Sequence, residues 1–202
     1  MKLLNLIKKR ATTRNYTKKI VSKKKINIIL DAASWGPSLG GFQVGIFVVI
    51  RNKKIKDKIN DILKKRLKRL GVVGRAVFVP STMSSLETCS ILIAIYTSGK
   101  FEGLISSFAK YTTKNKKNNI FVKLAQQAEI SAVSASIQNM TLIIEEMGLG
   151  SCWLNIPLFC EAEIKKLLKI DNKLVAFLAV GNFTKKEKRA TRLSIDQTRR
   201  FL

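Results

Sequence analysis

Near its start the chain carries two arginines and two threonines within five residues, Arg10-Ala11-Thr12-Thr13-Arg14. Arginine presents a planar fork of N–H donors and keeps its charge, while threonine hydroxyls and free backbone amides complete the shell of donors that a phosphate needs. The stretch is therefore a candidate anion site. Because the chain is rich in lysine throughout, the alternative is a basic turn that only faces water.

A second candidate is the stretch at residues 35–41, which reads Trp-Gly-Pro-Ser-Leu-Gly-Gly. Gly36 and Pro37 are stop signals for the helix predicted before them, and the residues that follow have little side-chain bulk. Such a loop can bring its backbone close to a flat ligand. The alternative is a plain connection from a helix to a strand.

The composition excludes several kinds of site. The 202 residues contain no histidine, which excludes Ser-His-Asp and Cys-His nucleophile systems and zinc sites with histidine ligands. The three cysteines, Cys89, Cys152 and Cys160, are too few for a cysteine-only zinc site, so no metal site is expected. Their odd number and wide spacing indicate reduced thiols in an intracellular protein. We find neither a secretory signal nor a run of roughly 18 apolar residues, and so expect a cytoplasmic protein.

The net charge of +25 predicts a strong positive field that attracts nucleic acid, anionic lipid or small phosphorylated ligands. The excess is mostly lysine and is spread from Lys8 to Lys188, whereas a nucleic-acid site would gather arginine and aromatic residues on one element. The helix predicted over 53–70 has a basic outer face and is the best candidate for contact with nucleic acid or a membrane surface. A solvated face over a core-facing stripe is the favoured interpretation.

These candidates need a scaffold. A hydrophobic content of 46% is enough for one core, so we expect a single domain over residues 1–202. Apolar runs predict buried strands over 44–50, 89–96 and 174–180 and a short strand within 148–157. Helical spacing of apolar residues predicts helices over 3–7, 22–35, 53–70, 120–147 and 161–168.

The helix predicted over 120–147 is the longest element. Its centre at 131–136 consists almost entirely of small residues, and few charges flank it, so we expect burial in the core or across a subunit interface. Residues 71–119 are a variable middle region, in which 71–87 are expected to form a surface loop beside a pocket and 97–119 a lid without an assigned role. Residues 182–202 form a basic tail.

Four of these stretches resemble, in order and spacing, the nitroreductase family of FMN-dependent oxidoreductases. Members often open with a helix that leads into Arg-x-Ser-x-Arg-x-Phe, which residues 10–16 match as Arg-Ala-Thr-Thr-Arg-Asn-Tyr. The family's Pro-Ser-x-x-Asn-x-Gln loop matches residues 37–43, and its central helix followed by Gly-Leu-Gly-Ser-Cys-Trp matches residues 128–153. Its C-terminal helix, strand and glycine match residues 164–181, and Arg192 falls where the family keeps a basic residue.

The resemblance implies an α+β fold with a mainly antiparallel central sheet flanked by helices and a long buried helix at a homodimer interface. It implies that NADH or NADPH reduces a bound FMN and leaves, and that a small flat acceptor, a nitroaromatic or a quinone, then takes its place. No catalytic side chain is expected, because the flavin ring carries the chemistry. Two other classes stay open. One is a basic binding protein without redox activity, and the other is a flavin carrier or dedicated flavin dehydrogenase of the same fold.

The resemblance also implies four groups of cofactor-binding residues. The FMN phosphate and nearby ribityl oxygens would be held by the turn with Arg10, Ala11 and Thr12, and by Arg192. Arg14 would reach the pyrimidine edge of the flavin. The residues that would pack on the flavin from the partner subunit are Pro37, Ser38 and Leu39, and Gly41 in the same loop is also counted among the cofactor-binding residues. The residues that would pass the ring near its reactive nitrogen are Asn155, Ile156 and Pro157.

The sequence departs from the family's pattern at three places. Gly41 stands where asparagine is usual, and Val44-Gly45 replace the Pro-Trp that often follows the family's glutamine. Ala190 replaces a basic residue in the tail, where a neighbouring arginine or lysine could compensate. These departures bear on the identity of the substrate more than on flavin binding.

Overall fold

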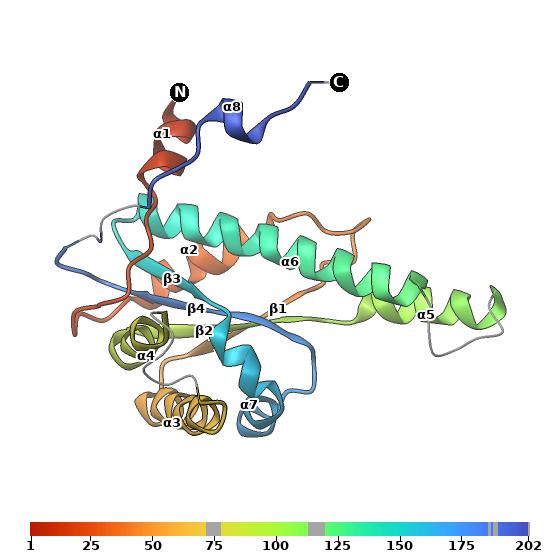
Figure 1. The fold of residues 1–202 in the computed structure, drawn as a ribbon, viewed down its shortest axis with the longest axis horizontal. Coiled ribbons are helices and arrows are strands. Elements are labelled where there is room, and N and C mark those ends of the chain that lie inside the picture. The colour runs from red at the N-terminus through yellow and green to blue at the C-terminus, as the bar shows by residue number, and fades with distance from the viewer. Residues whose placement is uncertain (72–77, 113–119, 186, 188–189, 202) are drawn as a thin grey trace.

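A four-stranded antiparallel sheet forms the centre of the protein in the computed structural model (Figure 1). The structure describes residues 1–71, 78–112, 120–185, 187 and 190–201. In their order across the sheet, the strands are β1 (Gly45–Ile50), β2 (Ile91–Thr97), β4 (Leu174–Gly181) and β3 (Gly150–Leu154). All neighbouring pairs are antiparallel. The predicted α+β class with an antiparallel central sheet is therefore confirmed.

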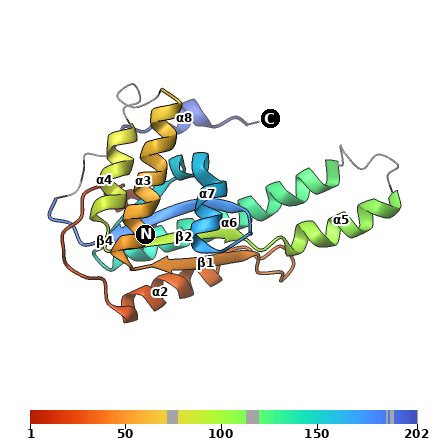
Figure 2. The ribbon, with the colours of Figure 1, turned by 90° about the horizontal axis from the view of Figure 1, so that it is seen from below.

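Helices cover both faces of this sheet (Figures 1 and 2). One face carries α2 (Lys23–Ser34) and α6 (Ile120–Glu146), and the other carries α3 (Lys53–Arg69), α4 (Phe78–Thr88) and α7 (Glu161–Leu168). The remaining helices are α1 (Lys2–Lys9), α5 (Lys100–Thr112), the 3₁₀ helix η2 (Ile156–Cys160) and α8 (Ile195–Thr198). Because both faces are covered, the two central strands are buried at every position. This accounts for their unbroken apolar sequences.

The long helix α6 packs closely on the end of α2. A Cβ at Gly36 would lie 2.2 Å from Oγ of Ser136, so the close approach depends on glycine at one side and a small residue at the other. The middle and end of α6 are buried as predicted, with Ile144 fully enclosed. Its first turns differ from the prediction, because Ile120 and Leu124 are more than half exposed. There α6 extends beyond the sheet together with α5 (Figure 2).

The start of α5 is held by a buried carboxylate on α6. Glu129 accepts hydrogen bonds from the backbone N–H groups of Gly99, Phe101 and Glu102 over distances between 2.8 and 3.1 Å. These are donors that a helix start leaves without a partner. Much of the lid expected over 97–119 is thus the helix α5, whereas residues 113–119 lie outside the described part of the chain.

The surface loop predicted over 71–87 is wrong in its second half, where α4 forms. Val79 and Leu86 are buried at helical spacing against the sheet. Serine and threonine lowered the helical signal, yet here Ser85 and Thr88 donate their hydroxyls to carbonyl oxygens one turn earlier. Pro80 lies in the first turn, where its missing N–H costs no hydrogen bond. Residues 72–77 lie outside the described residues.

Candidate functional site

The stretch from Arg10 to Arg14 lies against the start of β3. The backbone N–H of Thr13 donates to the carbonyl oxygen of Ser151 over 2.8 Å, and Thr12 forms an isolated parallel bridge with the same residue. A Cβ at Gly150 would lie 2.7 Å from the side chain of Thr13, so the turn can approach the strand this closely only beside glycine. The turn is therefore fixed to the edge of the sheet.

Tyr16 holds this turn from the interior. Its hydroxyl lies 2.5 Å from the carbonyl oxygen of Thr13 and 3.1 Å from that of Ala179 in β4. Burial raises the pKa of Tyr16 well above its ordinary value, and the nearby Cys152 adds to the increase. The phenol therefore stays protonated and can donate to these carbonyl groups.

The three predicted arginines differ in their partners. The carboxylate of Glu187 accepts a hydrogen bond from the backbone N–H of Arg14 over 3.0 Å and forms an ion pair with its guanidinium. In the described part of the chain, no hydrogen bond or ion pair engages the guanidinium of Arg10 or that of Arg192. Arg10 and Thr12 thus offer free donors at the turn, whereas Arg14 already has a carboxylate partner. Arg192 is exposed in the tail.

Beyond Ser151 the outer edge of β3 is open. Since the carbonyl of Ser151 points away from β4, alternation along the strand places the backbone groups of Trp153 on the same outer side. No strand of the described residues pairs with it there. Trp153 is 37% exposed, while Cys152 and Leu154 beside it are buried. The strand leads into Asn155 and η2, so the predicted segment 155–157 lies at the end of this open edge.

The loop at residues 37–43 has an unusual backbone. The φ angles of Leu39, Gly41 and Gln43 are +50°, +94° and +48°. Ser38 closes the loop, because its Oγ accepts from the N–H of Gly41 over 3.3 Å and its carbonyl oxygen accepts from Gln43 over 3.2 Å. A φ of +94° disfavours any side chain, which accounts for glycine where the resemblance expects asparagine. Positive φ at two non-glycine residues is a strain typical of functional sites.

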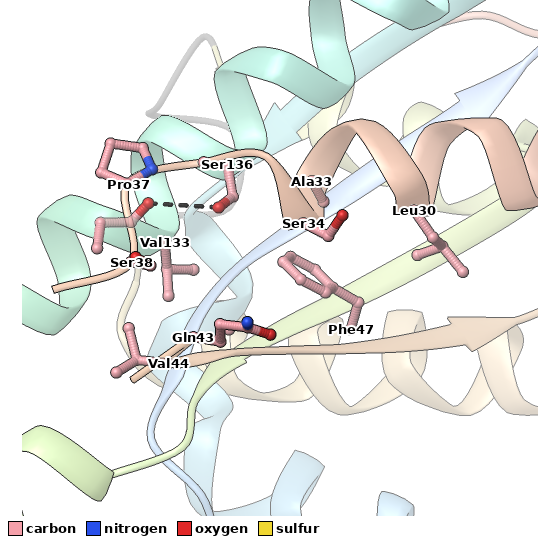
Figure 3. A pocket seen from close by; sticks show the side chains of 13 residues that line it. Leu30, Ala33, Ser34, Pro37, Ser38, Gln43, Val44, Phe47, Val133 and Ser136 are labelled. Atoms are coloured by element: carbon pink, nitrogen blue, oxygen red, sulfur yellow. Dashed lines mark hydrogen bonds between the residues drawn. The ribbon is translucent and has the colours of Figure 1, made fainter. Parts of the chain in front are cut away.

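A cavity of about 210 Å³ lies behind this loop, between α2, β1 and α6 (Figure 3). Leu30, Val44, Phe47 and Val133 form much of its apolar wall, and Gln43 lines it as well. Sites for drug-sized ligands usually begin at roughly 300 Å³. The cavity alone is therefore too small for a flavin nucleotide.

One chain does not bring all the predicted residues together. The turn at Arg10 and the segment at Asn155 lie along β3, whereas the loop at 37–43 leads into β1, at the opposite edge of the sheet. Strand spacing places the two edges roughly 14 Å apart. Among the described residues, no hydrogen bond joins Arg192 to either group. A single chain thus supplies two separate partial sites.

Reasoning from the sequence did not identify three residues that shape the candidate site, namely Tyr16, Glu187 and Trp153. Tyr16 was noted only as the end of a motif, and Glu187 was not noted at all. Glu187 carries no local signal, because its partner Arg14 lies 173 residues away. Trp153 did carry a local signal, because apolar residues stand on both sides of it at Cys152 and Leu154. When these two face the core, the alternation of a strand turns the indole to the other face.

The sequence of the chain matches the model of a known protein family. The sequence matches the model described as the Nitroreductase family over residues 7–182. The chain belongs to the Nitroreductase family. The matched span includes the turn at Arg10, the loop at 37–43 and the end of β3, and it excludes Arg192.

Solved structures with similar folds include flavoproteins and nitroreductases. A BluB-like flavoprotein from Clostridium difficile 630 has 25% sequence identity and a TM-score of 0.80, with 100% of this chain and 99% of that chain covered. A protein described as a nitroreductase in complex with FMN, from Desulfovibrio desulfuricans, has 21% identity, a TM-score of 0.68 and coverage of 97% and 94%. One described as an NADH dehydrogenase/NAD(P)H nitroreductase, from Parabacteroides distasonis ATCC 8503, has 20% identity, a TM-score of 0.68 and coverage of 98% and 96%. No curated protein matches the sequence.

In this member of the Nitroreductase family the thiols are not reactive groups. All three cysteines are free and buried. Burial raises the pKa of Cys89 and that of Cys160 to about 11, and it also raises the pKa of Cys152. They therefore stay neutral at physiological pH and are poor nucleophiles. Within the described ranges, no helix combines the length and the apolar character needed to cross a membrane.

Proposed function

We propose that this protein is an FMN-dependent oxidoreductase that uses NADH or NADPH to reduce small flat acceptors of the nitroaromatic or quinone type. Membership of the Nitroreductase family supports an oxidoreductase. Similar folds described as a complex with FMN and as an NAD(P)H nitroreductase support the choice of cofactor and reductant. FMN, when bound, supplies the hydride transfer, so no acid or base side chain is required.

The observation that carries the proposal is the set of donors beside the start of β3. Arg10 and Thr12 present a guanidinium and a hydroxyl without described partners, on a turn fixed by Thr13 and Tyr16. A phosphate monoester needs several such donors, and arginine binds it in a bidentate manner. The residues present therefore fit FMN. Arg10 and Thr12 would bind its phosphate together with Arg192, and Arg14 would face the pyrimidine edge.

A homodimer is part of the proposal. The two partial sites at opposite edges of the sheet can enclose one flavin if a second copy brings its loop at 37–43 to the β3 edge of the first. The helix α1 also has no buried residue, and Leu3 and Ile7 on its apolar side are 62% and 44% exposed. A second copy would cover such a surface. Analytical ultracentrifugation should give twice the chain mass of 22.7 kDa, and a monomer would contradict this part.

The first experiment is the spectrum of the purified protein. A yellow preparation with a flavin spectrum that bleaches on adding NADH or NADPH supports the proposal. A colourless protein that takes up no FMN and binds polynucleotide with a steep dependence on salt would instead support a basic binding protein. Flavin that neither nicotinamide bleaches would favour a carrier or a dedicated dehydrogenase of the same fold.

The phosphate assignment has a sharper test in the double variant Arg10→Ala/Arg192→Ala. Loss of two charged donors should weaken FMN binding by roughly 100-fold or more, since hydrogen bonds to charged groups contribute about 1.5–3 kcal/mol each. The matched control is Lys18→Ala, an exposed cation in the same N-terminal segment. Equal FMN dissociation constants for the double variant and the control would show that the assignment is wrong.

A further inference from the structure

The side chain of Asn155 has a defined orientation at the end of β3. The indole Nε1–H of Trp153 donates to Oδ1 of Asn155 over 2.9 Å. An indole nitrogen can only donate, so the carboxamide must turn its oxygen toward Trp153 and its NH₂ group away from it. Within the described residues, no acceptor takes a hydrogen bond from this NH₂ group. Asn155 is exposed, so both of its N–H donors are available to a ligand.

The position of Asn155 in the chain makes this orientation informative. Asn155 is the N-cap residue of η2, where asparagine commonly turns its oxygen to the first N–H groups of the helix. Its side chain makes no such bond. Instead its backbone carbonyl accepts from the N–H of Leu158 over 3.0 Å, and Pro157 in the first turn has no N–H to be capped. The start of the helix therefore does not compete with Trp153 for the carboxamide oxygen.

The donor of this hydrogen bond, Trp153, has a fixed backbone. It lies within β3 opposite Leu178 of β4, and both of its neighbours in the strand are buried. The backbone of Trp153 is therefore fixed by the sheet, while its indole remains partly exposed on the face that α6 covers. A tryptophan anchored in this way restricts the rotamer of Asn155 more than a loop residue would.

We propose that Trp153 is a positioning residue that presents Asn155 as a hydrogen-bond donor to an oxygen atom of the electron acceptor. The inference rests on the proposed function and on the family resemblance, which implies that residues 155–157 pass the flavin ring near its reactive nitrogen. A quinone takes one hydride from NAD(P)H by way of the flavin and one proton from water, and the products are the hydroquinone and NAD(P)⁺. Its carbonyl oxygen gains negative charge as the hydride arrives. A donor already aimed at that oxygen lowers the barrier.

This orientation also defines the substrate class. Acceptors with a carbonyl or nitro oxygen beside the reacting atom gain from the donor, and acceptors that take electrons without such an oxygen do not. Since the indole takes one lone pair of Oδ1 and the NH₂ group points away from Trp153, the side chain of Asn155 presents its N–H donors on the side away from the indole. Substrates that accept a hydrogen bond there are therefore favoured.

The experiment separates the two half-reactions of the FMN-loaded protein by rapid mixing. Trp153→Phe keeps an aromatic ring and removes the indole N–H. We expect the bleaching of the flavin by NADH or NADPH to stay within about twofold of the wild-type rate, and reoxidation by p-benzoquinone to fall about 10-fold. Reoxidation by ferricyanide, which takes single electrons and needs no oxygen-directed donor, should not change. Asn155→Asp replaces the donor by a carboxylate and should slow the quinone step at least as much.

Phe201→Leu is the control, because Phe201 is an aromatic residue that is 86% exposed in the tail and belongs to neither partial site. Its ratio of quinone to ferricyanide rates should equal that of the wild type. An unchanged quinone rate in Trp153→Phe would overturn the inference. So would an equal slowing with both acceptors, which indicates a structural role alone.

A measurement without flavin tests the bond itself. The ¹⁵N-labelled protein should give two indole N–H signals, and Asn155→Ala should shift the one that Trp153→Phe removes. If that signal does not move, the inference is overturned even where the protein binds FMN. If the wild-type protein takes up no FMN, the proposed function fails and the donor role fails with it, whatever the indole signals show.

Discussion

The two outer edges of the sheet both carry segments predicted to bind the cofactor, but they are held in different ways. At the β3 edge, the turn with Thr13 is fixed by Ser151 and by the buried Tyr16, which are distant in sequence. At the β1 edge, the loop at 37–43 is closed by its own residue Ser38. The first segment is positioned by the fold as a whole, and the second mainly by its local backbone conformation.

The two edges also differ in their chemistry. The loop at 37–43 contains no ionisable side chain. Tyr16 and Cys152 lie at the β3 edge and interact with Cys89, which precedes β2, and the pKa values of all three are raised above the ordinary values, mainly by burial. Substitutions that disturb close packing, and changes of pH, should therefore lower stability strongly at the β3 edge and little at the β1 edge.

The largest effect is expected from Gly150→Val. A side chain at this position would meet three atoms of Thr13 within 2.8 Å and would push the turn away from β3. We expect a loss of about 3 kcal/mol in the free energy of unfolding, together with weaker FMN binding. Denaturant unfolding measures the first and a flavin titration the second. Gly103→Ala is the control, because a Cβ there meets no atom within 4 Å and alanine favours the helix α5. If Gly150→Val and Gly103→Ala had equal effects, close packing against β3 would not be what positions the turn.

A smaller effect is expected from alkaline pH. The pKa of Cys89 is about 11 in the folded protein, against an ordinary value of 9.0. The unfolded chain therefore loses this proton at a lower pH than the folded protein does. The contribution of the neutral Cys89 thiol to the free energy of unfolding is present below pH 9 and is lost as the pH rises from 9 toward 11. For Cys89 alone the loss at pH 10 is about 1 kcal/mol, and Tyr16 and Cys152 act in the same direction at the pH where each ionises.

Denaturant unfolding at pH 8 and pH 10 measures this dependence. Cys89→Ala should reduce the difference between the two pH values, whatever its own effect on stability. A variant in the uncharged loop, such as Gly41→Ala, should leave the difference as large as in the wild type. If the loop variant changed it more than Cys89→Ala, the chemical contrast between the edges would be wrong.

The smallest effect is expected from Gly41→Ala itself. Its φ of +94° is strained for any side chain, but a Cβ there meets no atom within 4 Å. The cost is therefore conformational only, about 1 kcal/mol, and the loop can relax part of it. Thermal unfolding should show a small decrease, whereas a loss as large as that of Gly150→Val would mean that packing also fixes the β1-edge loop.

The sequence was sufficient for the elements with strong patterns. The strand at Leu174–Gly181 and the helix at Glu161–Leu168 follow from an apolar run and from helical spacing, because burial on both faces or on one face leaves that pattern. The Ser22 cap of α2 was also predictable, and its Oγ accepts from the N–H of Lys25 over 3.4 Å. The helix α4 was missed, because serine and threonine prefer turns until the sheet supplies packing partners.

The candidate site was predictable only in part, for a physical reason. The types of residue at Arg10 and Thr12 show what the turn can bind. Its placement depends on a glycine, a strand and a tyrosine contact that no local pattern encodes. The positive φ angles of Leu39 and Gln43 were likewise hidden, because neither is a residue that favours them.

The contact between Tyr16 and Ala179 has a consequence for the order of events during synthesis. The two residues are 163 positions apart, so the turn that is translated among the first residues has no place to dock until almost the whole chain has left the ribosome. At typical rates of translation this interval is roughly 10 to 30 seconds. Until then the hydroxyl of Tyr16 lacks its partner in β4, and the turn reaches its final place only when β4 completes the sheet.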